Sequence, residues 1–207
     1  VDYKYIKNKE EGFKLLKDAQ KSKYFSLDLE TTSLDPWRGL PICASISTKI
    51  RQGRVFNFFD KRVPEDKVDW VWTKEFAQAL YNLIHSGVLI YGQNLKFDLH
   101  YLDIQYFRIV LGKRLNIWKI NFREVLLMSM LLDENISKAL KEQAQMYTDI
   151  MYDKRILDMI ESGRILELTV EERLCYSASD SDATLRVGLI AQKRLKIEED
   201  GVLWKLF

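Results

Sequence analysis

Two acidic residues, separated by one position, lie in an otherwise apolar segment. Asp28 and Glu30 belong to FSLDLE, and in an extended strand residues i and i+2 point to the same side. Two carboxylates on one face of a buried strand repel each other and lose solvation unless a cation lies between them. Oxygen ligands of this kind suit Mg²⁺ or Mn²⁺. The pair therefore indicates a divalent metal site, with a solvated strand end before the turn-like TTSLDP as the alternative.

Two later segments carry further candidate side chains. Asn94 and Asp98, in YGQNLKFD, follow a predicted strand and share one face of the helix that comes next. Tyr176 and Asp180, in YSASD, are one helical turn apart, and a phenol beside a carboxylate can position a water molecule. Each segment alone has a structural alternative: a helix cap, a surface acid, or a half-buried tyrosine bonded to an acid. The three segments in this order are much more specific than any one of them.

The segments FSLDLETTSLD, YGQNLKFDLHYL and YSASDSDATL resemble the three exonuclease motifs of the proofreading domain of family A DNA polymerases. That domain is a DEDD exonuclease of the subgroup with Tyr in the third motif. The resemblance implies that Asp28, Glu30 and Asp180 bind one divalent cation, Mg²⁺ or Mn²⁺, and that Asp28 and Asp98 hold a second. It also implies that Glu30 and Tyr176 orient the attacking water. The expected reaction is hydrolysis from the 3′ end of single-stranded or frayed DNA, with release of nucleoside monophosphates.

Five residues are candidate contacts to the substrate. By the same resemblance, Leu34 would lie against the terminal base, and Tyr152, twelve residues beyond Leu140, matches the spacing of another aromatic contact. Phe97 could stack on a base, with ordinary core packing as the favoured alternative. Gln93 and Asn94 could donate hydrogen bonds to sugar or phosphate.

Apolar periodicity and turn residues predict an alternation of strands and helices that would position these side chains. The predicted strands cover residues 24–30, 41–48, 54–59, 88–91 and 118–122, with a hairpin turn around Gln52-Gly53. The predicted helices cover residues 9–20, 74–85, 95–110 and 124–134, together with a long helix that Thr169 and Glu172 open as a capping box.

This order of elements predicts an α/β fold with a mixed sheet. The resemblance makes it a ribonuclease H-like five-stranded sheet with helices on both faces. It covers nearly the whole chain and differs from the family at Arg123-Glu124, where many members have an Asp-Thr-like pair. That difference lies outside the metal motifs.

The composition is typical of one compact domain over residues 1–207. Of the 207 residues, 47% are hydrophobic, and the 9 Gly and 3 Pro form no linker-like run. The start at Val1 and the apolar ending VLWKLF suggest a fragment of a longer, polymerase-type polypeptide. A net charge of +2 excludes binding to nucleic acid through a large basic excess. A groove, a few cations, aromatic stacking and bound metal would have to hold the DNA.

The two cysteines have no metal-ligand spacing. Cys43 and Cys175 both lie among apolar residues, which predicts buried free thiols and a reducing, cytoplasmic location. No apolar run approaches the length of a membrane span, so no membrane partner is expected. The expected partners are the 3′ end of single-stranded DNA and a polymerase domain in the same parent chain. Two alternatives stay open: an RNA-trimming, ribonuclease D-like exonuclease, and a nucleic-acid-binding module that has lost catalysis.

Overall fold

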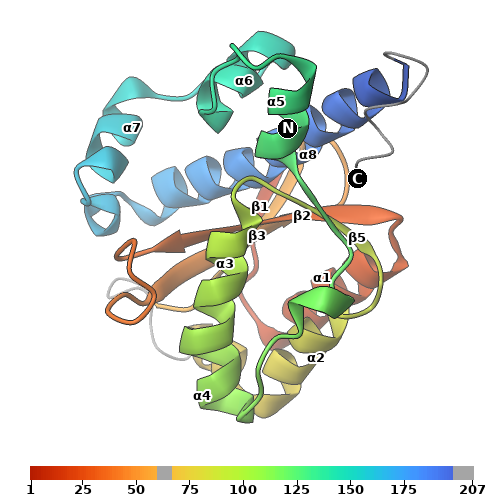
Figure 1. Ribbon diagram of the computed structural model, residues 1–207. Coiled ribbons are helices and arrows are strands. Elements are labelled where there is room, and N and C mark those ends of the chain that lie inside the picture. Colours follow the sequence, from red (N-terminus) through yellow and green to blue (C-terminus); the bar gives the residue numbers. More distant parts are fainter. Residues whose placement is uncertain (60–66, 198–207) are drawn as a thin grey trace.

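A computed structural model describes residues 1–59 and 67–197 and contains a six-stranded mixed sheet with helices on both faces (Figure 1). The strands lie in the order β1-β4-β3-β2-β5-β6. Their bounds are β1 Asp2–Tyr5, β2 Tyr24–Thr31, β3 Pro41–Ser47, β4 Gln52–Asn57, β5 Leu89–Gly92 and β6 Phe122–Glu124. The predicted α/β fold class is confirmed, with one strand more than expected.

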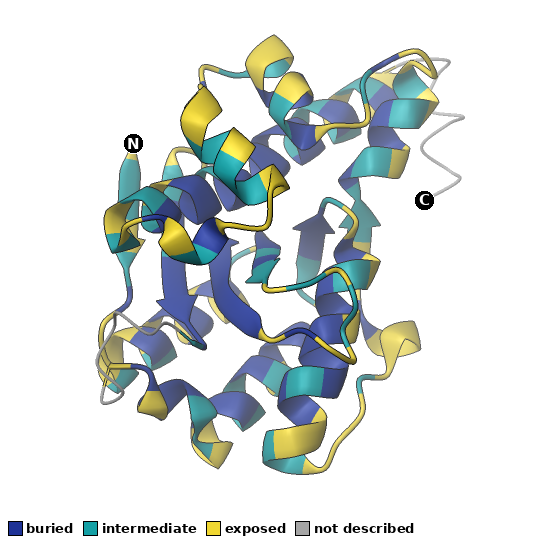
Figure 2. Ribbon diagram, turned by 90° about the vertical axis from the view of Figure 1, so that its left-hand side faces the viewer, coloured by how far each residue is buried: buried dark blue, intermediate teal, exposed yellow. Residues whose placement is uncertain are grey.

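The helices separate into two layers (Figure 1). One layer contains α1 (Lys9–Lys21), α2 (Lys74–Ile84), α3 (Leu95–Leu102) and α4 (Arg108–Leu111), and the other contains α5 (Val125–Leu132), α6 (Leu140–Tyr147), α7 (Lys154–Glu161) and α8 (Val170–Ile197). Figure 2 shows the strands at the centre of the sheet in the colour of buried residues, between these layers. None of the helices in the described ranges is long and apolar enough to span a lipid bilayer.

Strand β2 lies in the middle of the sheet, and its successive side chains point alternately to the two layers of helices. It pairs antiparallel with β3 and parallel with β5, as the predicted mixed sheet requires. Phe25, Leu27 and Leu29 pack into the apolar core beneath the sheet with α1, α2 and α3. Ser26, Asp28 and Glu30 therefore point to the opposite side. The Ser26 hydroxyl accordingly donates to the carbonyl oxygen of Ser181 in α8, 2.6 Å away.

Helix α8 crosses this second face and contacts strands β1 to β5. Its start is the predicted capping box: the Thr169 N–H donates to the Glu172 carboxylate at 2.8 Å, and the Glu172 N–H donates to the Thr169 hydroxyl at 3.2 Å. A Cβ atom at Gly53 would lie 2.8 Å from the backbone oxygen of Ala178. Only glycine at this position of β4 lets the helix approach the sheet so closely.

Several element boundaries differ from the predictions. The hairpin turn lies over residues 48–51, ahead of Gln52, because Arg51 takes the left-handed conformation and donates its N–H to buried Asp182. The predicted helix over 95–110 contains a π turn at Asp103–Phe107, and this turn places the adjacent Tyr106 and Phe107 both in the core. The strand predicted near 118–122 is a 3-10 turn, Ile117–Lys119, followed by β6.

The cysteine prediction was correct for one residue. Cys43 is buried in β3, whereas Cys175 is exposed. Its neighbours Leu174 and Tyr176 are apolar, but adjacent residues of a helix point in different directions, so apolar neighbours in the sequence do not imply burial.

Candidate active site

Three of the four predicted acids converge between β2 and α8. Carboxylate oxygens of Asp28, Glu30 and Asp180 all lie within 4.8 Å of one another. Asp28 and Glu30 reach this point because both lie on the α8 side of β2, and Asp180 reaches it from the buried face of α8. The spacing argument made from the sequence therefore holds for all three.

Hydroxyl groups connect the two elements on either side of these acids. Ser181, next to Asp180, accepts or donates a hydrogen bond with the Ser47 hydroxyl at 2.9 Å, in addition to its carbonyl bond to Ser26. Ser177 lies 3.3 Å from the Cys43 thiol and donates to Glu30 at 3.5 Å. These buried polar contacts fix the register between α8 and the sheet, and so the separation of the acids.

Asp98 lies beside this group. It occupies the first turn of α3, directly after β5, with 3% of its surface exposed. Burial raises its pKa well above the ordinary value, and the charges of Asp28 and Glu30 raise it further. The structure thus brings Asp98 within electrostatic reach of the other acids, but it is not part of the group whose oxygens meet within 4.8 Å.

Glu124 positions Asp98 and was not predicted to matter. Its carboxylate accepts the N–H groups of Asn94 at 2.6 Å and Leu95 at 2.9 Å, across 30 positions of the chain. Asn94 takes the left-handed conformation, with φ of 60°, and its side chain makes no capping hydrogen bond. The alternative of Asn94 as a side-chain cap is therefore wrong. Glu124 holds the start of α3 instead, since a carboxylate there satisfies unpaired N–H groups and interacts favourably with the helix dipole.

The clustered acids hold protons more tightly than isolated ones. Burial, followed by the charge of Asp180, raises the pKa of Asp28 to about 7, although Lys141 opposes the shift. Burial, followed by the charges of Asp28 and Asp180, raises the pKa of Glu30 well above its usual value. A positive charge placed near these acids would lower their raised pKa values. The cluster therefore favours the binding of a cation.

A lysine and two tyrosines complete the cluster. Lys141, in the first turn of α6, donates from Nζ to Asp180 Oδ2 at 2.8 Å. The Tyr176 and Tyr152 rings lie edge to face, with centroids 6.1 Å apart. Tyr176 is 6% exposed and Asp180 is 3% exposed, so the predicted pair does share the inner face of α8. Lys141 had no motif to mark it, because it precedes Asp180 by 39 positions.

The candidate substrate contacts lie in different environments. Leu34 is 87% exposed. It lies in the loop after β2, whose backbone carbonyls at Ser33 and Asp35 accept from the Tyr101 hydroxyl of α3. Phe97 is half-buried and packs on the core, with its ring centroid 5.0 Å from that of Tyr101. Gln93 donates to the backbone oxygen of Lys138 at 3.0 Å, so it connects β5 to the segment before α6.

Asp182, two residues beyond Asp180, is fully buried. Its carboxylate accepts from the Tyr3 hydroxyl at 2.9 Å and from Arg186 Nη2 at 2.9 Å. It therefore fixes α8 to β1.

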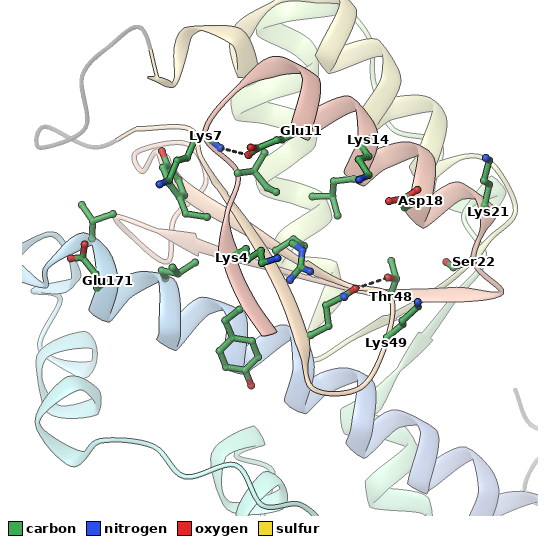
Figure 3. Close-up of a pocket in the computed structure, with 18 residues that line it drawn as sticks. Lys4, Lys7, Glu11, Lys14, Asp18, Lys21, Ser22, Thr48, Lys49 and Glu171 are labelled. Carbon is green, nitrogen blue, oxygen red and sulfur yellow. Dashed lines mark hydrogen bonds between the residues drawn. The ribbon is translucent and has the colours of Figure 1, made fainter. Parts of the chain in front are cut away.

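A cavity of about 1070 Å³ lies elsewhere, between β1, α1 and the start of α8 (Figure 3). Lysines and acids line it, among them Lys7, Glu11 of α1 and Lys49 of the turn between β3 and β4. None of the candidate catalytic residues does, so cavity size does not mark the candidate site in this fold.

Comparison with known proteins gives the family to which this fold and acid cluster belong. The sequence model of the 3′-5′ exonuclease family matches residues 3–196. The chain therefore belongs to this family, the exonuclease domains of family A DNA polymerases. A relative, DNA polymerase I of Borreliella burgdorferi, is 29% identical over 200 residues, which cover 95% of the chain and 20% of the relative. The chain thus spans about a fifth of that polymerase.

Solved structures share the fold at low identity. The Nibbler EXO domain of Aedes aegypti has a TM-score of 0.67 at 12% identity, covering 98% of this chain and 94% of that one. Escherichia coli RNase D has a TM-score of 0.63 at 13% identity, covering 100% and 49%. Brucella melitensis NrnC with bound Mg²⁺ has a TM-score of 0.60 at 19% identity, covering 89% and 79%. The ribonuclease H-like architecture expected from the motifs is therefore confirmed.

Proposed function

We propose that this domain is a metal-dependent 3′→5′ exodeoxyribonuclease that hydrolyses the terminal phosphodiester of single-stranded or frayed DNA and releases nucleoside monophosphates. The observation that carries the proposal is the meeting of Asp28, Glu30 and Asp180 within 4.8 Å. Within family A polymerases such an activity serves proofreading, and a polymerase domain in the same parent chain is the partner we propose for it. The DNA polymerase I relative supports this assignment.

The residues of the cluster fit divalent cations. Carboxylate oxygens are the ligands that Mg²⁺ and Mn²⁺ prefer. Asp180 Oδ1 is buried and has no hydrogen-bond partner among the described residues, as expected for an atom that serves as a metal ligand. Asp28, Glu30 and Asp180 would hold one cation, and Asp28 with Asp98 a second. Bound there, the cations would lower the pKa of a water molecule and neutralise the negative charge that develops on the phosphate.

Glu30 and Tyr176 act on the attacking water by orientation. Burial, followed by the charge of Asp180, raises the pKa of Tyr176 far above the ordinary 10. The phenol therefore keeps its proton at neutral pH, so it donates a hydrogen bond and does not act as a base. Glu30 is held by Ser177 and can accept the hydrogen bond of the same water.

Leu34 and Tyr152 are the proposed contacts to the terminal nucleotide. Leu34 projects from a loop that Tyr101 fixes, so an exposed apolar side chain is held ready to contact a base. Tyr152 borders the cluster next to Tyr176. Phe97, Gln93 and Asn94 are assigned weaker, supporting contacts. A paired end would have to melt before it could enter, which favours single strands and mismatched termini.

Digestion of a single-stranded DNA labelled at one end tests the proposal. With Mn²⁺, a 5′ label should give a ladder that shortens one nucleotide at a time, and a 3′ label should be released as a mononucleotide. Excess chelator should stop both. Internal cuts, loss from the 5′ end, or full activity in chelator would contradict the proposed reaction.

RNA is a second candidate substrate, favoured by the structural likeness to E. coli RNase D. A matched RNA strand of the same sequence separates the two, because only the 2′-hydroxyl differs. Faster digestion of RNA than of DNA would assign the domain to RNA trimming. Metal and DNA binding without digestion of either strand would assign it to a non-catalytic binding module.

A further inference from the structure

Lys141 brings a positive charge into the acid cluster from a separate element. The acids belong to β2 and α8, whereas Lys141 lies in the first turn of α6. Its Nζ is 2.8 Å from Asp180 Oδ2, 5.0 Å from the centroid of the Tyr176 ring and 5.8 Å from that of Tyr152. The ammonium group therefore has one carboxylate and two aromatic faces as neighbours.

This pair differs from an ordinary surface salt bridge. The Asp180 side chain is 4% exposed and that of Lys141 is 29% exposed, so solvent screens their interaction only in part. The ordinary pKa of a lysine side chain is about 10.4, and an adjacent carboxylate favours the charged form. Lys141 therefore carries its charge at neutral pH.

The position of the ammonium group conflicts with a metal ion bound by the same acids. Asp180 is one of the three residues whose oxygens converge, and Lys141 already occupies its Oδ2. A divalent cation on Asp180 would be repelled by a positive charge within a few ångströms, in a partly desolvated site where such repulsion is strong. The long lysine side chain has alternative rotamers, and its exposed part gives it room to turn outward.

We propose that Lys141 is a resident cation of the metal-free site, which neutralises Asp180 and competes with divalent metal for it. The inference rests on the proposed metal site. Lys141 would then set the concentration of free metal at which the site is occupied. Its charge would also reduce the repulsion among the four neighbouring acids when no metal is bound. The ammonium group supplies locally the positive charge that metal would otherwise provide.

The test compares Mn²⁺ binding to the wild type and to Lys141→Met, by titration calorimetry without substrate. Methionine keeps the length of the side chain and packs well on aromatic rings, so the substitution removes mainly the charge. We expect Lys141→Met to bind Mn²⁺ about 10- to 100-fold more tightly, the equivalent of one lost charge-assisted hydrogen bond. In chelator it should melt about 2–4 °C below the wild type, because the acids lose their counter-charge.

Two control variants separate charge from fold. Lys141→Arg keeps the positive charge and should bind Mn²⁺ as the wild type does. Lys138→Met removes an exposed charge from the segment before α6 and should also leave binding unchanged. Equal or weaker Mn²⁺ binding by Lys141→Met, with the wild type binding normally, would refute the competition and leave the proposed function standing. Failure of every variant to bind Mn²⁺ would instead refute the metal site itself, and with it this inference.

Discussion

The metal-free protein should lose stability as the pH rises from 5 to 8, and Asp28 should cause much of the loss. Its pKa is raised from 3.8 to about 7 in the folded chain, so the folded state holds this proton more tightly than the unfolded state does. The stabilisation is complete below pH 4 and is lost as the pH rises through 7. Each tenfold difference in proton affinity corresponds to about 1.4 kcal/mol, so the total is ~4 kcal/mol at most. About 2–3 kcal/mol of it falls between pH 5 and pH 8.

The perturbation is Asp28→Asn, which leaves a neutral side chain of the same shape at every pH. Urea denaturation of the metal-free proteins at pH 5 and pH 8 gives the free energies of unfolding. The advantage of Asp28→Asn over the wild type should be about 2–3 kcal/mol larger at pH 8 than at pH 5. Comparing this difference at two pH values cancels packing effects that do not depend on pH.

Glu30 and Asp98 also have raised pKa values and contribute in the same direction, whereas three acids elsewhere do not. The pKa values of Asp2, Asp149 and Glu172 are lowered, chiefly by bonds to arginine or to backbone N–H, so their contributions change below about pH 4.5. Asp158→Asn, on the exposed side of α7, is the matched control and should show no pH-dependent difference. If the gap between Asp28→Asn and the wild type is the same at both pH values, Asp28 does not hold a proton in the metal-free fold, and the reasoning fails.

Three further predictions concern single side chains. Tyr176→Phe should lower turnover roughly 10- to 1000-fold, because only the orientation of the attacking water is lost. Its affinity for Mn²⁺ should stay within about a few-fold of the wild-type affinity. Kinetics equal to those of the wild type would show that the third motif is structural. Glu124→Ala should lower the free energy of unfolding by about 1–3 kcal/mol, because it leaves the Asn94 and Leu95 N–H groups unpaired. It should also weaken metal binding through Asp98. An unchanged urea denaturation curve would argue that Glu124 does not hold the start of α3. Leu34→Ala should leave the melting temperature unchanged, because the residue is 87% exposed. It should weaken the binding of single-stranded DNA, measured with Ca²⁺ as the divalent metal, by roughly 5- to 30-fold. Unaltered DNA affinity would remove Leu34 from the proposed binding surface.

The sequence was sufficient to predict which candidate side chains share a face, because this depends only on the local periodicity of a strand or helix. A strand places Asp28 and Glu30 on one face, and a helix places Tyr176 beside Asp180, whatever the rest of the chain does. The capping box at Thr169 and Glu172 was also correct, because it uses contacts within three residues. These are the features that carried the motifs.

Features that depend on distant contacts could not be predicted in this way. Glu124 bonds to a segment 30 positions earlier, and Lys141 meets an acid 39 positions later, so neither has a signal in its own neighbourhood. Strand β1 is four residues long and pairs with β4, about 50 positions away. A short segment with an exposed lysine at position 4 lacks the apolar run that marks a strand, and its pairing partner supplies the structure.

Single-turnover digestion of a 5′-labelled single strand by the wild type and by Asp28→Asn, across a range of Mn²⁺ concentrations, tests the central claim most directly. If Asp28 binds the catalytic metal, the wild type should shorten the strand one nucleotide at a time from the 3′ end. Asp28→Asn should then leave the strand intact at every Mn²⁺ concentration, although it folds and binds DNA. Metal-dependent shortening by Asp28→Asn at the wild-type rate would show that the catalytic centre lies elsewhere.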